Sequence, residues 1–256
     1  MRTKPRVSTF RDANFEAIER LKPDLIITYS DVQAEITREA ISRGLPVLNF
    51  NQRSVTEIFS FVSMISRVIR KQERGDELLS SFESLLQKIS GAAESFGRRP
   101  RVFFEEWNDP LISGIQWVEE LLEIAGGETI FPEFHNCKKA KDRIATPEQV
   151  IERNPDVIIV SWCGMKANKH DIASRPGWDQ IAAVRHGHIY EIRSANILQP
   201  GPACLTEGIR QLHCILAHFS GQPVAGELMP KEHVDPGLLP NTLEDEVRSG
   251  SQLRHG

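Results

Sequence analysis

The sequence predicts an α/β fold in which two small parallel-sheet lobes are joined by one long helix. Two observations support this prediction: a helix-and-strand pattern that occurs twice, and a proline-free segment of helical periodicity between the two copies. A chain of 256 residues that is 40% hydrophobic is long enough to bury two small cores. We therefore divide the chain into an N-terminal lobe (1–54), a linking helix (55–97), a C-terminal lobe (98–220) and a poorly ordered tail (221–256).

The repeated pattern is an amphipathic helix that stops at a proline and is followed at once by a short strand. The two copies are 16–28 (EAIERLKPDLIIT) and 148–160 (EQVIERNPDVIIV). Pro23 and Pro155 end the helices, because a proline pushes the residue before it out of the α region. Both strands are continuous apolar runs, which is typical of a parallel sheet that helices cover on both faces.

Each copy is followed by a second helix and strand of the same type. In the N-terminal lobe we expect a helix over 34–43 and a strand over 46–50, and in the C-terminal lobe a helix over 178–185 and a strand over 188–192. A glycine follows each of these helices, as expected for a left-handed C-cap. In such arrays of parallel strands, ligands bind at the carboxyl ends of the strands.

The linking segment, 55–96, contains no proline, and its apolar residues recur at helical spacing. Ser54 or Thr56 can cap its start, and Gly97 can end it. A continuous helix of about 40 residues would span roughly 60 Å. The alternative is a helical hairpin that turns near Gly75.

Composition and motifs exclude several classes of protein. The net charge of −4 comes from charges scattered along the chain, so we expect no nucleic-acid partner. The longest apolar runs are the length of strands and too short to cross a bilayer. No nucleophile elbow, phosphate-binding loop or His-Glu-x-x-His motif is present, so we expect no enzyme and no catalytic residues. The four cysteines lack the spacing of a zinc site, and we expect no built-in metal and no cofactor.

Four motifs carry a resemblance to a known family: KPDLII at 22–27, PRVFFEEW at 100–107, ISG at 112–114 and LEIAGGETIF at 122–131. With their order along the chain, they resemble the helical-backbone (class III) periplasmic substrate-binding proteins of ABC importers. Within that group the chain looks most like the cobalamin-binding proteins, with siderophore and haem binders as sister classes. The resemblance implies a monomer that binds a corrinoid between its lobes and docks transiently on a membrane permease.

The chain departs from this family in three respects. The opening strand and helix of the family's first lobe have no counterpart here. Glu35 matches a permease-docking glutamate of the first lobe, but Gln199 stands in the matching region of the second; Glu35 can equally be a solvated helix residue. The resemblance implies a periplasmic or extracytoplasmic protein, whereas Met1 to Arg6 is followed by no signal-peptide core. The alternative is therefore a cytoplasmic protein that binds or senses a corrinoid.

The candidate ligand contacts follow the ends of strands. They are Tyr29, Asn51, Trp107, Trp162 and Cys163. Aromatic faces at strand ends suit a large flat ligand, although both tryptophans could instead belong to the core. Cys163 could bind a soft metal or simply be a small buried side chain.

Two loops add further candidates. Ser113 and Gly114 match a turn near the ligand in the family, and the alternative for Ser113 is the N-cap of the next helix. Asn196 and Gln199 lie in the loop after the last strand, where a plain surface loop explains them equally well. The ligand set predicted from the sequence therefore has nine members, with a siderophore, haem or metal chelate as the alternative ligand.

Overall fold

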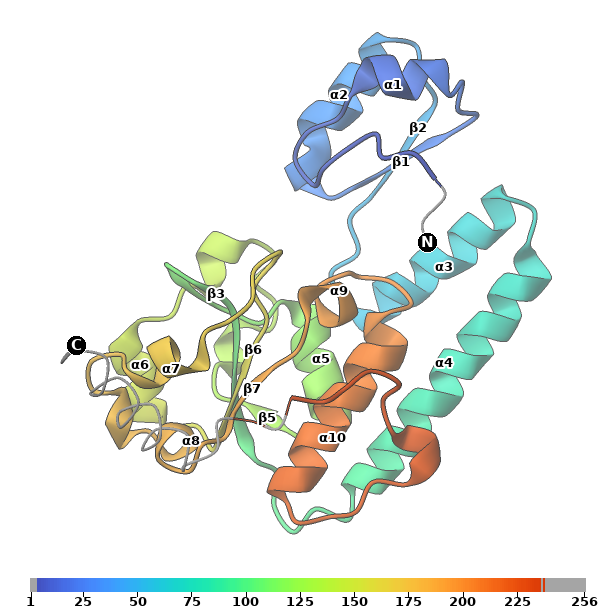
Figure 1. Ribbon diagram of the computed structural model, residues 1–256. Helices are drawn as coiled ribbons and strands as arrows, with labels where there is room; N and C mark the ends of the chain where they lie inside the picture. The colour runs from blue at the N-terminus through green and yellow to red at the C-terminus, as the bar shows by residue number, and fades with distance from the viewer. Residues whose placement is uncertain (1–3, 236, 238–256) are drawn as a thin grey trace, which may run out of the picture. The chain divides into compact units, whose positions relative to one another are not determined.

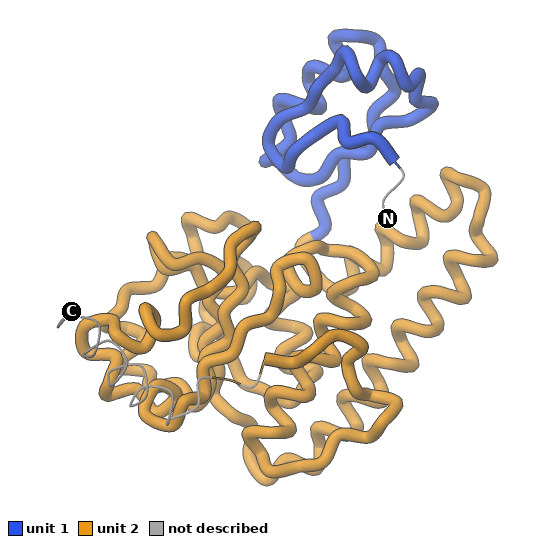
Figure 2. Tube along the Cα trace, in the orientation of Figure 1, with its two compact units in different colours: residues 1–52 blue, residues 53–256 orange. Residues whose placement is uncertain are grey.

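The computed structural model describes residues 4–235 and 237 of the chain. The chain divides into two compact units, 1–52 and 53–256, which Figure 2 shows in different colours. The first unit alternates helices and strands as the repeat predicts. Its elements are α1 (Phe15–Arg20), β1 (Ile26–Tyr29), the 3-10 turn η1 (Asp31–Gln33), α2 (Ala34–Ser42) and β2 (Val47–Phe50).

The sheet of the first unit has two parallel strands. β1 pairs with β2 in the register Ile26 to Val47 and Tyr29 to Phe50. α1 starts where the Asn14 side chain accepts a hydrogen bond from the Ala17 N–H at 2.9 Å. Because the strands are parallel, their carboxyl ends lie at the same edge of the sheet.

The second unit is built on a five-stranded sheet. Its strands are β3 (Arg101–Asn108), β4 (Leu111–Ser113), β5 (Glu128–Thr129), β6 (Val157–Val160) and β7 (Ile189–Glu191). The order is β4-β3-β6-β7, with β5 also paired to β3, and only β4 runs antiparallel to its neighbour. The predicted helix over 178–185 is interrupted: a 3-10 turn, η4 (Trp178–Gln180), precedes the short α8 (Ala182–Arg185).

Helices cover both faces of this sheet, as Figure 1 shows for α5 and α10 on one side and α6, α7 and α8 on the other. The bounds are α5 (Gln116–Ile124), α6 (Pro147–Arg153), α7 (Lys169–Ala173), α9 (Ser194–Ile197) and α10 (Ile209–Phe219), which follows a π-helical turn, η5 (Cys204–Gly208). Along β6, Val157 and Ile159 enter one core cluster, whereas Ile158 and Val160 enter the other. The apolar run of this strand is continuous because both of its faces are buried.

The prediction of one long linking helix is wrong. The segment forms two helices, α3 (Val55–Val68) and α4 (Gln72–Ala93), which pack side by side as a hairpin (Figure 1). The chain turns at residues 69–71, where Arg70 has a left-handed φ of 57°. Phe59 and Phe82 meet edge to face, with ring centroids 6.2 Å apart. The apolar stripes of the two helices therefore face each other and exclude an extended rod.

The alternative hairpin was expected to turn at Gly75, but this glycine lies inside α4. A Cβ at Gly75 would stand 2.3 Å from Ser66 Oγ, so the glycine lets the two helices approach closely. Ile58, Phe82 and Ile89 belong to the core of the second unit. The hairpin is thus part of this unit, and the first boundary follows Gln52.

The described part of the predicted tail is folded against the second unit. Leu228, in the 3-10 turn η6 (Gly226–Leu228), is only 3% exposed, and Glu227 forms an ion pair with Lys88 at 2.7 Å. Asp235 pairs with Lys169 at 2.5 Å. The expectation of poor order is therefore wrong for 221–235, and residues 236 and 238–256 of the predicted tail lie outside the described residues. Within the described ranges, no helix has the length and apolar character needed to cross a membrane.

Candidate ligand-binding site

The carboxyl end of β3 carries two glutamates, each held by an arginine from another element. Glu105 is fully buried and accepts hydrogen bonds from both terminal nitrogens of Arg175, at 2.6 and 2.8 Å. Glu106 accepts a hydrogen bond of 2.8 Å from Arg143, whose side chain is 1% exposed. Paired in this way, the two carboxylates can be tolerated near the core.

Trp162 is part of this arrangement and not of an open surface. Its ring is 6% exposed, and its indole N–H donates a hydrogen bond of 3.0 Å to Glu105. The ring packs in the core cluster on the β6 face that contains Ile158 and Val160. This corrects the expectation that the Trp162 ring lies open to a ligand, because its polar and apolar surfaces are both already satisfied inside the unit.

Trp107 and Cys163 lie closer to the surface. Trp107, near the end of β3, is half-buried, and its indole N–H donates to the Asp109 carbonyl at 3.0 Å. Cys163 follows β6 and is exposed with a free thiol, so the interpretation of Cys163 as a buried hydrophobic side chain is wrong. Because β3 and β6 are parallel neighbours, the structure brings these two residues to the same edge of the sheet.

The Ser113–Gly114 turn ends β4 and is buried. Ser113 is 1% exposed, and its carbonyl accepts a hydrogen bond from Arg143. It does not cap a helix, since α5 begins after Ile115, which caps it without a side-chain hydrogen bond. A Cβ at Gly114 would stand 2.3 Å from Glu119 Oε1. The Ser113 hydroxyl is therefore not offered at the surface, contrary to expectation.

Asn196 and Gln199 have different environments. Asn196, in α9, is 7% exposed, and its side-chain amide donates to Glu232 at 2.9 Å. Gln199 is exposed, and its carbonyl accepts a hydrogen bond from the Gly201 N–H at 2.8 Å. Asn196 thus serves the packing of the C-terminal segment, while Gln199 is open to solvent.

In the first unit, Tyr29 and Asn51 come together at the carboxyl edge of the sheet. The Tyr29 hydroxyl donates to the Gln52 carbonyl at 3.2 Å, and its backbone N–H donates to the Gln33 side chain at 2.8 Å. Asn51 follows β2 directly and is exposed. Both positions agree with the predicted end of a strand.

Glu35 lies in the first turn of α2 with a side chain that is 83% exposed, and it pairs with Arg38 at 2.9 Å. An ion pair this exposed contributes little stability. Two hollows lie in this unit: one of about 260 Å³ is lined by the segment before α1 and by α1, β1, η1 and α2, and one of about 370 Å³ by η1, α2 and β2. Neither is lined by Tyr29, Asn51 or Glu35.

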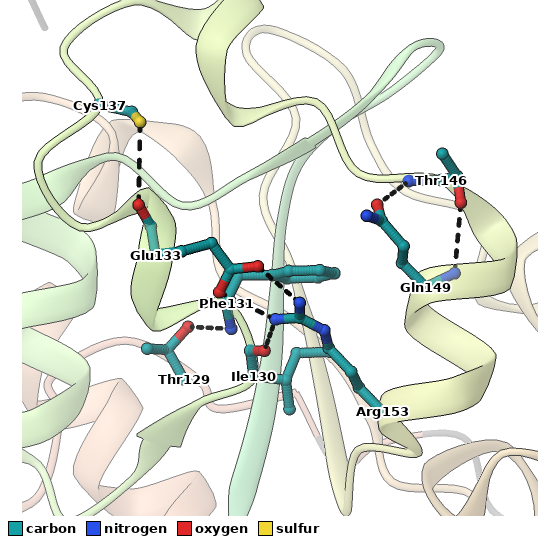
Figure 3. Close-up of polar contacts among 8 residues, drawn as sticks. All are labelled: Thr129, Ile130, Phe131, Glu133, Cys137, Thr146, Gln149 and Arg153. Carbon is teal, nitrogen blue, oxygen red and sulfur yellow. Dashed lines mark hydrogen bonds and ion pairs between the residues drawn. The ribbon is translucent and has the colours of Figure 1, made fainter.

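Sequence reasoning missed the residues that organise this edge. They are Glu105, Glu106, Glu119, Arg143 and Arg175. The available signal was a pair of acidic residues inside an otherwise apolar strand, because buried carboxylates require partners. The partners themselves are distant in sequence. Figure 3 shows another arginine whose partners come from a different part of the chain: Arg153 of α6 pairs with Glu133 and lies over the ring of Phe131. The distance from Arg153 Cζ to the centroid of this ring is 4.3 Å.

Comparison with known proteins adds a family relationship. Residues 1–195 match the periplasmic binding protein family. Three relatives are an uncharacterised ABC transporter substrate-binding lipoprotein, YvrC, of Bacillus subtilis (27% identical over 215 residues), the vitamin B12-binding protein of Vibrio parahaemolyticus (24% over 207) and the high-affinity heme uptake protein IsdE of Staphylococcus aureus (21% over 206). The matched regions cover 78%, 78% and 73% of this chain.

The chain spans 64% of the length of YvrC, 71% of the Vibrio protein and 66% of IsdE. Among solved structures, the periplasmic heme-binding protein RhuT of Roseiflexus superposes with a TM-score of 0.72 at 19% identity, covering 85% of this chain and 84% of that one. The vitamin B12-binding protein BtuF of Vibrio cholerae gives 0.63 at 23% identity, covering 85% and 83%. These likenesses show that the chain has the α/β fold of helical-backbone binding proteins.

Proposed function

The chain belongs to the periplasmic binding protein family, and from this membership we propose that it is the substrate-binding component of an ABC importer whose ligand is a corrinoid. The observation that carries the proposal is the family match over residues 1–195, which takes in all of the first unit and most of the second. The vitamin B12-binding relatives support the choice of ligand class. Such a carrier works through affinity and needs no chemical step.

The accessible predicted contacts are the residues that we assign to the ligand. They are Tyr29 and Asn51 in the first unit, and Trp107, Cys163 and Gln199 in the second. Aromatic rings and polar side chains at strand ends suit a large macrocycle with polar edges. Ser113, Gly114, Trp162 and Asn196 are buried, and we assign them to the support of these contacts.

The remaining parts of the proposal concern partners and location. Glu35, exposed on α2, is the proposed contact to the permease of the importer. We propose that the protein is monomeric and works outside the cytoplasmic membrane, as a substrate-binding lipoprotein or periplasmic protein does. A cytoplasmic corrinoid-binding or sensing protein is the alternative, and it predicts corrinoid binding without any association with a permease.

Titration of the purified chain with cyanocobalamin and with cobinamide by calorimetry tests the ligand. We expect saturable binding with one ligand per chain, weakened by roughly tenfold or more in Trp107→Ala, because an aromatic anchor contributes about 1.4 kcal/mol or more. Lys88→Ala, on the exposed face of α4, serves as the control and should bind as the parent does. No binding of either corrinoid at high micromolar concentration would exclude the ligand class.

A second candidate ligand is haem, which the relationship to the heme uptake proteins favours. The exposed Cys163 thiol is a group that can ligate haem iron. Calorimetric titration with hemin distinguishes the two ligands. The Soret absorption of the bound haem is measured in parallel. If haem is the ligand, Cys163→Ser should shift the Soret band, and the corrinoids should fail to compete.

A further inference from the structure

Glu119 is a buried acidic residue whose side chain packs against the Ser113–Gly114 turn. It lies in the first turn of α5 and is 2% exposed. Within the described residues neither carboxyl oxygen has a hydrogen-bond partner of ordinary geometry, although the Thr129 hydroxyl lies near enough to favour the charged form. Burial of a carboxyl without partners is costly, so this residue needs an explanation.

The contact between Glu119 and Gly114 is specific to glycine. A Cβ on Gly114 would stand 2.3 Å from Glu119 Oε1 and 3.3 Å from the ring of Phe104. The carboxyl group therefore occupies the space that any other side chain at position 114 would need. At the neighbouring residue of the same turn, Arg143 donates a hydrogen bond to the Ser113 carbonyl. The turn is thus in contact with two buried side chains.

The charge state of Glu119 follows from its surroundings. Burial raises its pKa to about 8, although the Thr129 hydroxyl and the charge of Arg143 oppose the rise. Glu123, on the same helix, and Glu106, on β3, add to the rise because they are negative. At neutral pH the side chain is therefore mostly a neutral acid, which can pack against a glycine without an ionic partner.

We propose that Glu119 is a positioning residue whose neutral carboxyl packs against Gly114 and holds the Ser113–Gly114 turn in its ligand-binding form. The inference rests on the proposed function, since that turn is assigned to support the ligand. It adds a regulatory property: loss of the proton places a negative charge against the turn, where Arg143 is the one cation among the described residues that opposes it, and this loosens the turn. Corrinoid affinity should then fall in alkaline solution.

A double-mutant cycle tests the contact without any ligand. Gly114→Ala should lower the Tm by roughly 3–10 °C, because overpacking of a filled site displaces its neighbours. Gly114→Ala made in a Glu119→Ala background should lower it by less than half as much, since the opposing carboxyl is gone. Gly97→Ala, where a Cβ meets nothing within 4 Å, is the matched control and should not couple to Glu119→Ala. If the changes in Tm caused by the two substitutions were additive, Gly114 and Glu119 would not be in contact and the proposal would be wrong.

The pH profile tests the positioning role. Cyanocobalamin affinity of the parent should fall at least threefold between pH 7 and pH 9, whereas Glu119→Gln, neutral at every pH, should keep the pH 7 value throughout. Glu123→Gln, an exposed change on the same helix, should retain the fall but begin it at a slightly lower pH, because Glu123 contributes to the raised pKa of Glu119. Equal profiles for the parent and Glu119→Gln would refute the proposal. If no corrinoid binds, the proposed function fails. Amide exchange at Gly114 then tests the inference by itself: between pH 7 and pH 9 it should accelerate more in the parent than in Glu119→Gln, and equal acceleration would refute the inference.

Discussion

Arg175 and Glu105 form a two-bond ion pair at the carboxyl end of β3, with distances of 2.6 and 2.8 Å and a carboxylate that is fully buried. The Arg175 guanidinium also lies over the Trp178 ring, 4.4 Å from its centroid. The pair joins the sheet to the segment that precedes η4, so it fixes the loops at the edge where the ligand is proposed to bind.

Breaking this pair should destabilise the second unit strongly. Arg175→Met leaves a buried carboxylate whose remaining hydrogen-bond donor among the described residues is the Trp162 N–H, and we expect a loss of about 3–5 kcal/mol in the free energy of unfolding. Arg193→Met removes an exposed pair with Glu232 and should cost no more than about 1 kcal/mol. Denaturant unfolding measures both. Equal losses would mean that burial does not determine how much the pair between Arg175 and Glu105 contributes to the free energy of unfolding.

The stability of the second unit should fall as the solution becomes alkaline. Because burial raises the pKa of folded Glu119 to about 8, the folded state holds a proton that the unfolded state releases above its ordinary pKa near 4.5. The stability that this proton contributes is therefore complete below pH 4.5 and is lost progressively as the pH rises to 8. The free energy of unfolding should fall by about 1.4 kcal/mol for each pH unit in this range. Urea unfolding of Glu119→Gln should lack this slope. A parent protein of constant stability from pH 5 to 8 would contradict the raised pKa.

The helical hairpin should depend on Gly75. Gly75→Ala places a Cβ 2.3 Å from Ser66 Oγ, so we expect a loss of about 1–3 kcal/mol despite the better helix propensity of alanine. Gly91→Ala, in the same helix α4 but with open space around the new Cβ, should be neutral or stabilising by up to about 1 kcal/mol. Thermal unfolding of the two variants gives the comparison. A stabilised Gly75→Ala would show that the helices do not meet at this residue.

The C-terminal segment should detach when Glu207 loses its charge. Burial would raise the pKa of Glu207, but hydrogen bonds from the Gln211 side chain and from the Glu232 and Lys231 N–H groups outweigh it and lower the pKa. The folded state therefore binds a proton less readily than the unfolded state, and docking is complete above the ordinary pKa and lost as the pH falls through the folded one.

Limited proteolysis can measure this detachment of the C-terminal segment. Cleavage within 224–235 should accelerate in acid for the parent, and at neutral pH for Glu207→Ala. Glu148→Ala, a surface change at the start of α6, should leave the cleavage rate unaltered. An unchanged cleavage rate in Glu207→Ala would show that these hydrogen bonds do not hold the segment.

The sequence by itself determined the elements whose signals are local. The repeat, with Pro23 and Pro155 after the helices, predicted β6 in its observed place and β1 to within two residues. The apolar run of β6 correctly predicted burial on both faces, whereas the same prediction is wrong for β1, where Ile27 is 48% exposed. The strand ends placed Tyr29, Asn51 and Cys163 at carboxyl edges of the two sheets. These signals suffice because backbone sterics and hydrophobic periodicity act within a few residues.

Only the tertiary structure decided which side chains meet. The turn of the hairpin lies at 69–71, because the apolar stripes of α3 and α4 pack on each other and on the core. Trp162 is buried because Glu105, far away in sequence, accepts its N–H, and Gly114 must be glycine because Glu119 fills the space beside it. Contacts of this kind depend on the folded positions of distant residues, so no local pattern of the chain contains them.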